Sequence, residues 1–336
     1  MQSKLENFFK IKTTYSISNK KCFVYDPENR SAQFVYQPDE SDVFICIKSN
    51  IKLFYRKPKI EDKSIYIPVI HTNLSVPLLK SNLQKAIRRH NNKIALSSSI
   101  ALLNKEPIEF LRRLPIIFVE DVCLLDSLPI IIWLMMVDKE YKLTNQDIYI
   151  ILDIVNNLCD VKDYFDYDNN IWTESYATID HSVLQSHNKS SELLSLYYRS
   201  LYGGMGGDIK LLQSAINYYK NNPDKIHIAS YNNLNLQEIN TIEVIEEAID
   251  FHPLPQMLQF IKQFIKQFII QSNKNNHDID IDKETIKKCI WFSQSGINLR
   301  KPSTIKEAEL NLASDNWKLI EPGLNIFRRK IMTEYM

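Results

Sequence analysis

The stretch "LQKAIRRHNNKIALSSSIALLNKEPIEFLRRLPIIFVEDVCLLD", residues 83–126, decides the fold of this chain. Its apolar residues recur three and four positions apart, it contains no glycine, and Pro107 and Pro115 stand where first helical turns would begin. This pattern predicts short helices joined by tight turns. Because the same spacing continues nearly to the carboxyl end, residues 76–336 are predicted to form an α-helical domain.

Helical spacing also identifies individual helices. The predicted ranges are 80–89, 92–105, 145–158, 191–202, 207–222, 240–251 and 254–271. In the last of these, Phe260, Phe264 and Phe268 share one face, which favours packing against the protein's own core over an exposed interaction helix. The strongly apolar run "PIIIWLMMV", 129–137, has about half the length of a membrane-spanning helix, so it is predicted to lie in the core and no membrane is expected as a partner.

The amino-terminal part has a different pattern. Five short segments rich in β-branched and aromatic residues are separated by Asp, Pro, Asn and Ser, and they cover 21–25, 32–36, 42–47, 51–56 and 64–70. These segments predict a small β module over 20–72. The predicted fold class is therefore mainly α, with a C-terminal helical array preceded by a small β-rich N-terminal module.

Composition limits the function classes. The 336 residues are 44% hydrophobic and 24% charged, as in ordinary globular proteins. Lys+Arg number 41 and Asp+Glu 40, so no overall field attracts the chain to nucleic acid, and such contacts would depend on local patches. The five cysteines are scattered without a C-x-x-C pair, and the amino terminus lacks a signal-peptide apolar stretch. A reduced intracellular protein is therefore predicted, with no metal site and no cofactor.

The first residues carry a peptide motif. "QSKLENFF", residues 2–9, fits Q-x-x-[ILM]-x-x-[FY]-[FY] and resembles the PIP box, by which replication and repair proteins bind the sliding clamp PCNA. The resemblance implies that Leu5, Phe8 and Phe9 fill an apolar pocket of the clamp from one 3₁₀-type turn, and that Gln2 fills a polar one. One tight turn does bring i, i+3 and i+4 side chains together, and two buried phenylalanine rings suit a small interface.

A flexible clamp-binding peptide over 1–12 is therefore expected, with PCNA as the partner and the nucleus or a viral replication site as the location. A chain terminus suits a peptide that must leave the body of the protein. The alternative is an ordinary amphipathic first helix that docks on the body.

Residues 83–126 carry a second resemblance. They are similar to the helical region behind the ATPase module of the RarA and Werner-helicase-interacting group of clamp-loader-like AAA+ proteins. In that group a basic helix, an Ala-rich helix, and R-R-L followed by E-D occur in this order. The matching residues here are Lys85, Arg88, Arg89, Arg112, Arg113, Leu114, Glu120 and Asp121. The resemblance implies a collar-like oligomerising scaffold, and it implies no ATPase motor, because G-x-x-x-x-G-K-[ST] does not occur in the sequence.

The same charged residues also have a direct interpretation. Arg112 and Arg113 precede Glu120 and Asp121 by eight residues, with a proline between them. This spacing predicts a partly buried ion-pair network between adjacent helices, which would fix the angle of the array. A DNA-facing or catalytic role for these residues is the alternative.

Glycines concentrate in one segment of this glycine-poor chain. The segment "YGGMGGD", 202–208, holds four of the six glycines, namely Gly203, Gly204, Gly206 and Gly207. This concentration predicts positive φ angles or a close approach of another group. Asp208 is predicted to cap the helix that follows. A tight helix connection is favoured over a phosphate-binding loop, and the segment is the best site candidate outside the terminus.

A basic segment with aromatic residues stands in the β module. "KLFYRKPK", 52–59, mixes cations that suit phosphates with rings that suit bases, although an edge strand blunted by lysines fits equally well. The candidate nucleic-acid contacts of the whole chain are Lys52, Arg56, Lys57, Lys59, Lys85, Arg88 and Arg89.

Together these patterns predict a non-enzymatic DNA replication or repair accessory factor, tethered to PCNA, whose scaffold binds DNA or another protein. One alternative is a DNA-processing enzyme with its site near residues 203–208 and 250–300. No catalytic residue can be assigned to it, because the sequence has neither a metal-ligand cluster nor a nucleophile elbow. The other alternative is a structural homo-oligomer in which Phe8 and Phe9 pack against a neighbouring subunit.

Overall fold

The computed structural model describes most of the chain. The described ranges are 22–59, 65–162, 190–231, 233–249, 255–271, 281–294 and 307–335. The strands are β1 (Cys22–Asp26), β2 (Ser31–Val35), β3 (Asp42–Lys48) and β4 (Ile51–Arg56). The helices are α1 (Val76–Arg88), α2 (Asn92–Lys105), α3 (Pro107–Asp121), α4 (Leu128–Val137), α5 (Asn145–Asp160), α6 (Ser191–Leu201), α7 (Gly206–Asn221), α8 (Pro255–Gln271), α9 (Lys283–Gln294) and α11 (Glu307–Tyr335). The predicted clamp-binding residues Gln2, Leu5, Phe8 and Phe9 lie outside these ranges.

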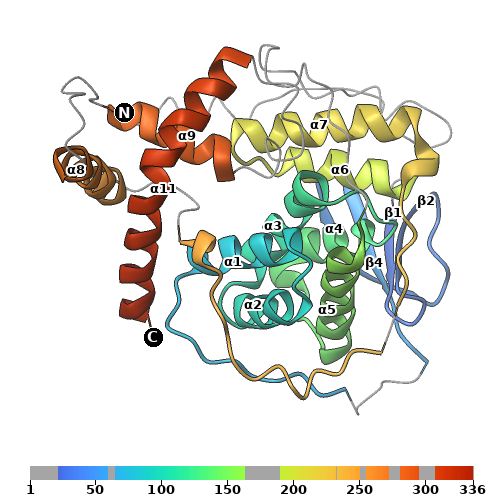
Figure 1. Ribbon diagram of the computed structural model, residues 1–336. Coiled ribbons are helices and arrows are strands. Elements are labelled where there is room, and N and C mark those ends of the chain that lie inside the picture. Colours follow the sequence, from blue (N-terminus) through green and yellow to red (C-terminus); the bar gives the residue numbers. More distant parts are fainter. Residues whose placement is uncertain are drawn as a thin grey trace, which may run out of the picture.

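The predicted fold class is confirmed, since helices dominate and a small sheet precedes them. The strand order is β2-β1-β4-β3; β1 pairs with β4 in parallel, and the outer pairs are antiparallel. Phe23 of β1 lies opposite Phe34 of β2 and Leu53 of β4, so these apolar side chains share one face of the sheet. In Figure 1 the sheet lies at one side of helices α1–α5, and α8, α9 and α11 lie at the other.

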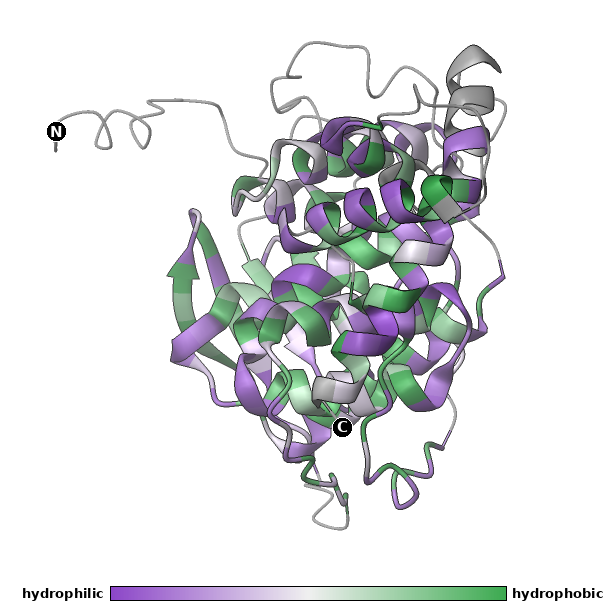
Figure 2. Ribbon diagram, turned by 60° about the vertical axis from the view of Figure 1, so that its left-hand side comes forward, coloured by the Kyte–Doolittle hydropathy of each residue, from purple (hydrophilic) through white to green (hydrophobic). Residues whose placement is uncertain are grey.

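Helix α4 forms the centre of the core. All of its residues are buried, as predicted for the apolar run. Trp133 of α4 donates its Nε1–H to the Phe23 carbonyl of β1 at 3.1 Å, and its ring centroid lies 5.0 Å from that of Tyr25. The strands and helices α1–α7 contribute to one hydrophobic cluster. The β module and the first part of the helical domain therefore share a core. Figure 2 shows hydrophobic (green) and hydrophilic (purple) residues alternating along the surrounding helices.

Capping residues explain where several helices begin. Ser75 accepts a hydrogen bond from the backbone of Leu78, and Asn91 accepts one from Ile94. Thr144 and Asp147 form a capping box at the start of α5. Each such cap stabilises a helix by about 1 kcal/mol, and this local chemistry is readable from the sequence.

A second hydrophobic cluster joins α8, α9 and α11. Phe260 and Phe264 pack against it, as predicted for this face of α8, whereas Phe268 remains 45% exposed. Gly323 lets α11 approach α8 closely, because a Cβ atom there would lie 2.8 Å from the Phe264 ring. At this crossing the Phe264 ring of α8 therefore packs directly against the backbone of α11.

The fifth predicted strand is not formed in its described part, residues 65–70. Pro68 interrupts this segment and has no N–H to donate to a neighbouring strand. The Ile65 carbonyl accepts a hydrogen bond from the Asn145 side chain of α5 at 3.2 Å instead. The segment therefore contacts the start of α5 and does not join the sheet.

The prediction that a helix begins at Pro115 is wrong, because α3 runs through this proline to Asp121. Proline removes one backbone hydrogen bond and usually ends a helix. Here packing outweighs that cost, since the residues around it, including Phe110, Leu114 and Phe118, are completely buried.

The predicted helix over 240–251 is also wrong: within its described residues only the single 3₁₀ turn η5 (Glu246–Ala248) forms. Asn82 of α1 provides the physical reason. Its amide nitrogen donates to the Glu243 carbonyl at 2.9 Å, and its oxygen accepts from the Ile245 N–H at 2.8 Å. Backbone groups that a helix would pair internally are thus bound to α1.

Buried tyrosines predict how stability depends on pH. Burial raises the pKa of Tyr25, Tyr198 and Tyr219, and the Asp147 carboxylate raises that of Tyr25 further. The folded chain therefore keeps protons that the unfolded chain loses above its ordinary tyrosine pKa of about 10. The contribution of these three tyrosines to the free energy of unfolding should be fully present below about pH 10. Above about pH 10 the free energy of unfolding should fall by about 4 kcal/mol per pH unit for the three groups together.

We therefore expect cooperative alkaline unfolding between about pH 10 and pH 12, because total stability is typically about 5–15 kcal/mol. Far-ultraviolet circular dichroism and tyrosinate absorbance, recorded on the same samples, measure it. The dichroism signal and the absorbance of the three buried tyrosines should change over the same pH range. Complete tyrosine ionisation with an unchanged dichroism spectrum would contradict this expectation.

Candidate functional site

The glycine-rich loop connects α6 to α7. Gly203 and Gly204 have positive φ angles of 74° and 147°, as the glycine concentration predicted. The prediction that Asp208 caps α7 is wrong, because the N-cap is Met205 and Asp208 lies in the first turn. Met205 has an extended backbone, so the helix begins directly at Gly206 and leaves the Asp208 side chain beside the turn.

Arg199 of α6 ties this loop to α3. Its Nη1–H donates to the Gly203 carbonyl at 2.8 Å, and its Nε–H and Nη2–H donate to the Arg112 carbonyl at 3.0 and 2.9 Å. Burial lowers the pKa of Arg199 to about 10, so the side chain still carries its charge at neutral pH. Arg199 therefore connects the glycine loop to the helix that carries the predicted charged network.

The charged residues of α3 form a network different from the one predicted. Because Pro115 does not end the helix, Arg113 and Glu120 lie on the same helix, where Arg113 Nη2 is 3.2 Å from Glu120 Oε2. Arg113 Nη1 also lies 3.9 Å from the Asp208 carboxylate of α7. Burial and the neighbouring Asp121 carboxylate raise the pKa of Glu120, against the effect of Arg113.

Asp121 is the buried centre of this network. Its two oxygens accept hydrogen bonds from Gln84 Nε2 at 2.6 Å and from Arg88 Nε at 2.5 Å, both on α1. Gln84 Oε1 accepts from Arg113 at 2.5 Å. Although burial alone would lower the pKa of Arg88, the Asp121 carboxylate raises it. The network thus joins α1, α3 and the start of α7.

The remaining candidate cations of α1 lie nearer the surface. Arg89 is 46% exposed in its side chain and forms two hydrogen bonds with the Glu247 carboxylate of η5, one of them 2.6 Å long. Burial raises the pKa of Glu247, but the Arg89 hydrogen bond lowers it overall. Lys85 is half-buried on the same helix.

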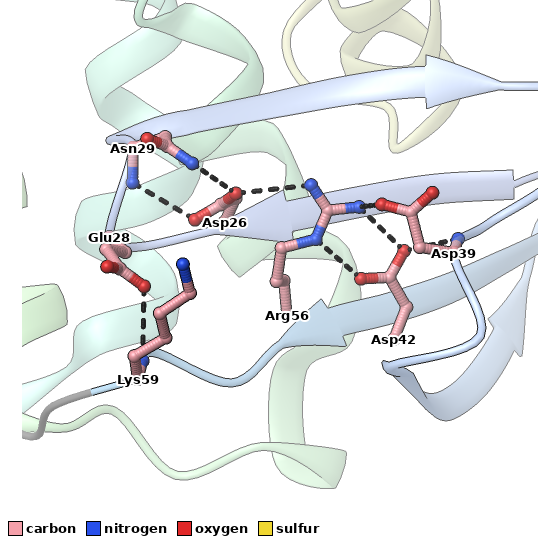
Figure 3. A network of polar contacts seen from close by, with 7 residues as sticks. All are labelled: Asp26, Glu28, Asn29, Asp39, Asp42, Arg56 and Lys59. Carbon is pink, nitrogen blue, oxygen red and sulfur yellow. Dashed lines mark hydrogen bonds and ion pairs between the residues drawn. The ribbon is translucent and has the colours of Figure 1, made fainter.

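Arg56, a candidate DNA contact, lies among three carboxylates at the end of the sheet (Figure 3). Its Nε is 2.7 Å from Asp42, its Nη1 is 3.3 Å from Asp26, and its Nη2 donates to Asp39. This arrangement raises the pKa of Arg56, and it gives the cluster a negative net charge. The sequence pattern missed these partners, which come from β1, β3 and the loop between β2 and β3.

The other residues of this basic segment differ in exposure. Lys52, Lys57 and Lys59 are exposed, and the Lys59 backbone N–H donates to Glu28 at 3.1 Å (Figure 3). The Tyr55 ring packs in the interior, with its centroid 5.4 Å from that of Tyr141. The exposed lysines are therefore the cations of this segment that stay accessible.

One pocket was not found from the sequence. It has a volume of about 480 Å³, and its walls come from the turn between β1 and β2, residues 65–66, α5 and residues 233–237. No local pattern indicates it, because Asn233, Asn235 and Gln237 are ordinary polar residues of a connecting segment.

In the described ranges, no three or more His, Cys, Asp or Glu side chains are placed to hold a metal ion. The helices of these same ranges include none with both the length and the apolar character needed to cross a bilayer. Much of 250–300, named above for the enzyme alternative, lies outside the described residues.

Comparison with protein-family models, with curated proteins and with solved structures finds no match for this chain. The function therefore has to be inferred from the chain's own residues.

Proposed function

We propose that this protein is a non-enzymatic accessory factor of DNA replication or repair, tethered to the sliding clamp PCNA by its first nine residues. The observation that carries the proposal is the match of residues 2–9 to every fixed position of the PIP box. Leu5, Phe8 and Phe9 form the apolar plug, and Gln2 is the polar anchor.

Physical chemistry supports this assignment of roles. Aromatic side chains that are buried at the centre of a small interface usually provide most of its binding energy. Lys10 and Lys12 follow the motif, and they suit an acidic partner surface along which the peptide extends by strand addition. Most of the binding energy of this peptide is therefore expected from its two phenylalanines.

The folded body is proposed to act as the scaffold. Arg88, Arg113 and Arg199 are bound to carboxylates, an amide and backbone carbonyls of the chain itself, which supports a structural role for the network around the glycine loop. The exposed Lys52, Lys57 and Lys59 are the cations that we assign to DNA phosphates.

The test is calorimetric titration of the full chain into PCNA of the same cell, or into a clamp encoded by the same virus if the gene is viral. We expect saturable binding that weakens by about a thousandfold in the double variant Phe8→Ala, Phe9→Ala, because each ring is expected to contribute about 2 kcal/mol or more.

The matched control is Glu6→Ala, Asn7→Ala, which alters two residues in the same peptide at positions that the motif leaves open. This control should bind like the unchanged chain. Absence of binding by the unchanged chain, or equal weakening by both double variants, would refute clamp tethering through the motif.

A further inference from the structure

The pocket beside the β1–β2 turn has the size of a small-molecule site. Its volume of about 480 Å³ falls within the usual range of about 300–1,000 Å³. Four segments that are distant in the sequence converge on it, so the fold rather than one loop defines its shape. Among the described residues, those that line it include none from the glycine loop.

Arg30 provides a fixed cation in this pocket. Its Nη1 donates to the buried carboxylate of Asp153 at 2.5 Å, and its guanidinium lies 5.7 Å from the ring centroid of Tyr149 and 4.8 Å from that of Tyr231. The side chain is 27% exposed, and within the described part of the chain its other guanidinium donors have no protein partner. The ion pair and the two rings therefore fix the planar guanidinium of Arg30, whose remaining N–H groups are available at the pocket.

A carboxylate and several amides complete the polar lining. Glu28 lies on the same turn as Arg30; one of its oxygens accepts from the Lys59 N–H, which leaves the other oxygen available (Figure 3). Gln146 and Gln237 provide groups that both donate and accept. The exposed ring of Tyr66 adds a flat apolar surface.

We propose that this pocket binds an unpaired guanine base. Guanine O6 and N7 accept two hydrogen bonds in the geometry that an arginine fork provides. Its N1–H and N2–H groups donate in turn to a carboxylate such as Glu28, and its flat ring suits stacking on tyrosine. The base is unpaired because these contacts use the edge that Watson–Crick pairing would occupy.

Other ligands fit this lining less well. Adenine presents an amino group where guanine has O6, so that group would oppose the donors of Arg30. Cytosine and thymine lack an N7 acceptor for the second donor of the fork. A phosphate alone would meet the carboxylates of Glu28 and Asp153 beside Arg30, which reduce the local positive charge.

The first experiment titrates the full chain, without PCNA, with the guanine, adenine and cytosine nucleoside monophosphates in parallel. Saturable binding of the guanine nucleotide, and much weaker binding of the other two, is expected. A parallel arm compares an oligothymidine that carries one central guanine with oligothymidine alone. Tighter binding of the guanine oligonucleotide identifies a DNA strand as the source, whereas binding of the nucleotide alone identifies a free nucleotide. Absence of guanine-dependent binding in both arms overturns the proposal.

Variants test the named contacts. Glu28→Gln is expected to weaken guanine nucleotide binding at least about tenfold, whereas Glu40→Gln, an exposed carboxylate outside the pocket, leaves it unchanged. Arg30→Lys keeps a charge beside Asp153 but loses the fork, and it should weaken binding similarly with an unchanged far-ultraviolet spectrum. Unaltered affinity in both pocket variants overturns the assignment. Because PCNA is absent, this result is independent of clamp binding.

Discussion

Replacement of Asp121 by alanine is expected to lower the free energy of unfolding by about 3–5 kcal/mol, because it removes the carboxylate that neutralises the largely buried Arg88. Asp121 has no exposed surface, and both of its oxygens accept hydrogen bonds from α1. Gln84 would lose its acceptor as well, and its second contact, with Arg113, connects the loss to α3. Urea unfolding followed by far-ultraviolet circular dichroism measures the change.

The neighbouring residue provides a matched control. Glu120 has a 20% exposed side chain and pairs with the likewise partly exposed Arg113, so Glu120→Ala should cost clearly less than Asp121→Ala, about 1–2 kcal/mol. Asp121→Asn should cost less than Asp121→Ala, since the amide oxygen still accepts a hydrogen bond. Equal losses for Asp121→Ala and Glu120→Ala would show that the buried network does not hold α1 against α3.

Local patterns located four strands and most helices, because their information lies within a few residues. The run of aromatic and apolar residues that includes Phe23 and Tyr25 predicts strand β1, and the uninterrupted apolar run around Trp133 requires burial on all sides. The prediction failed where a distant group competes for the backbone. Asn82 binds the backbone near residue 245, which is 163 positions away, and no local pattern contains that partner.

The candidate site divides in the same way. Positive φ at Gly203 and Gly204 was predictable, because only glycine adopts such angles at little cost. The carboxylates around Arg56 and the walls of the pocket were not predictable, since each of these residues is an ordinary surface residue in its own segment. Beside the pocket, for example, the Tyr231 hydroxyl donates to the Arg30 backbone carbonyl across 201 positions of sequence. Predicting such contacts needs the packing of the whole core.

Replacement of Trp133 by alanine is expected to cost about 3–5 kcal/mol, because it leaves a cavity where α4 meets the sheet. The indole is completely buried, and its centroid lies 5.0 Å from the ring of Tyr25 and 5.4 Å from that of Tyr141. Truncation also leaves the buried Phe23 carbonyl without the indole N–H that donates to it. Urea unfolding of the full chain measures the loss.

Trp133→Phe separates the two contributions. Phenylalanine keeps most of the ring volume but has no N–H, so the Phe23 carbonyl loses its donor while the cavity stays small, and we expect a cost of about 1–2 kcal/mol. The difference between the alanine and phenylalanine variants then measures packing between α4 and the sheet. If the two variants cost the same, the hydrogen bond rather than the packed indole would join the sheet to α4, and the shared core would be weaker at this contact than its burial indicates.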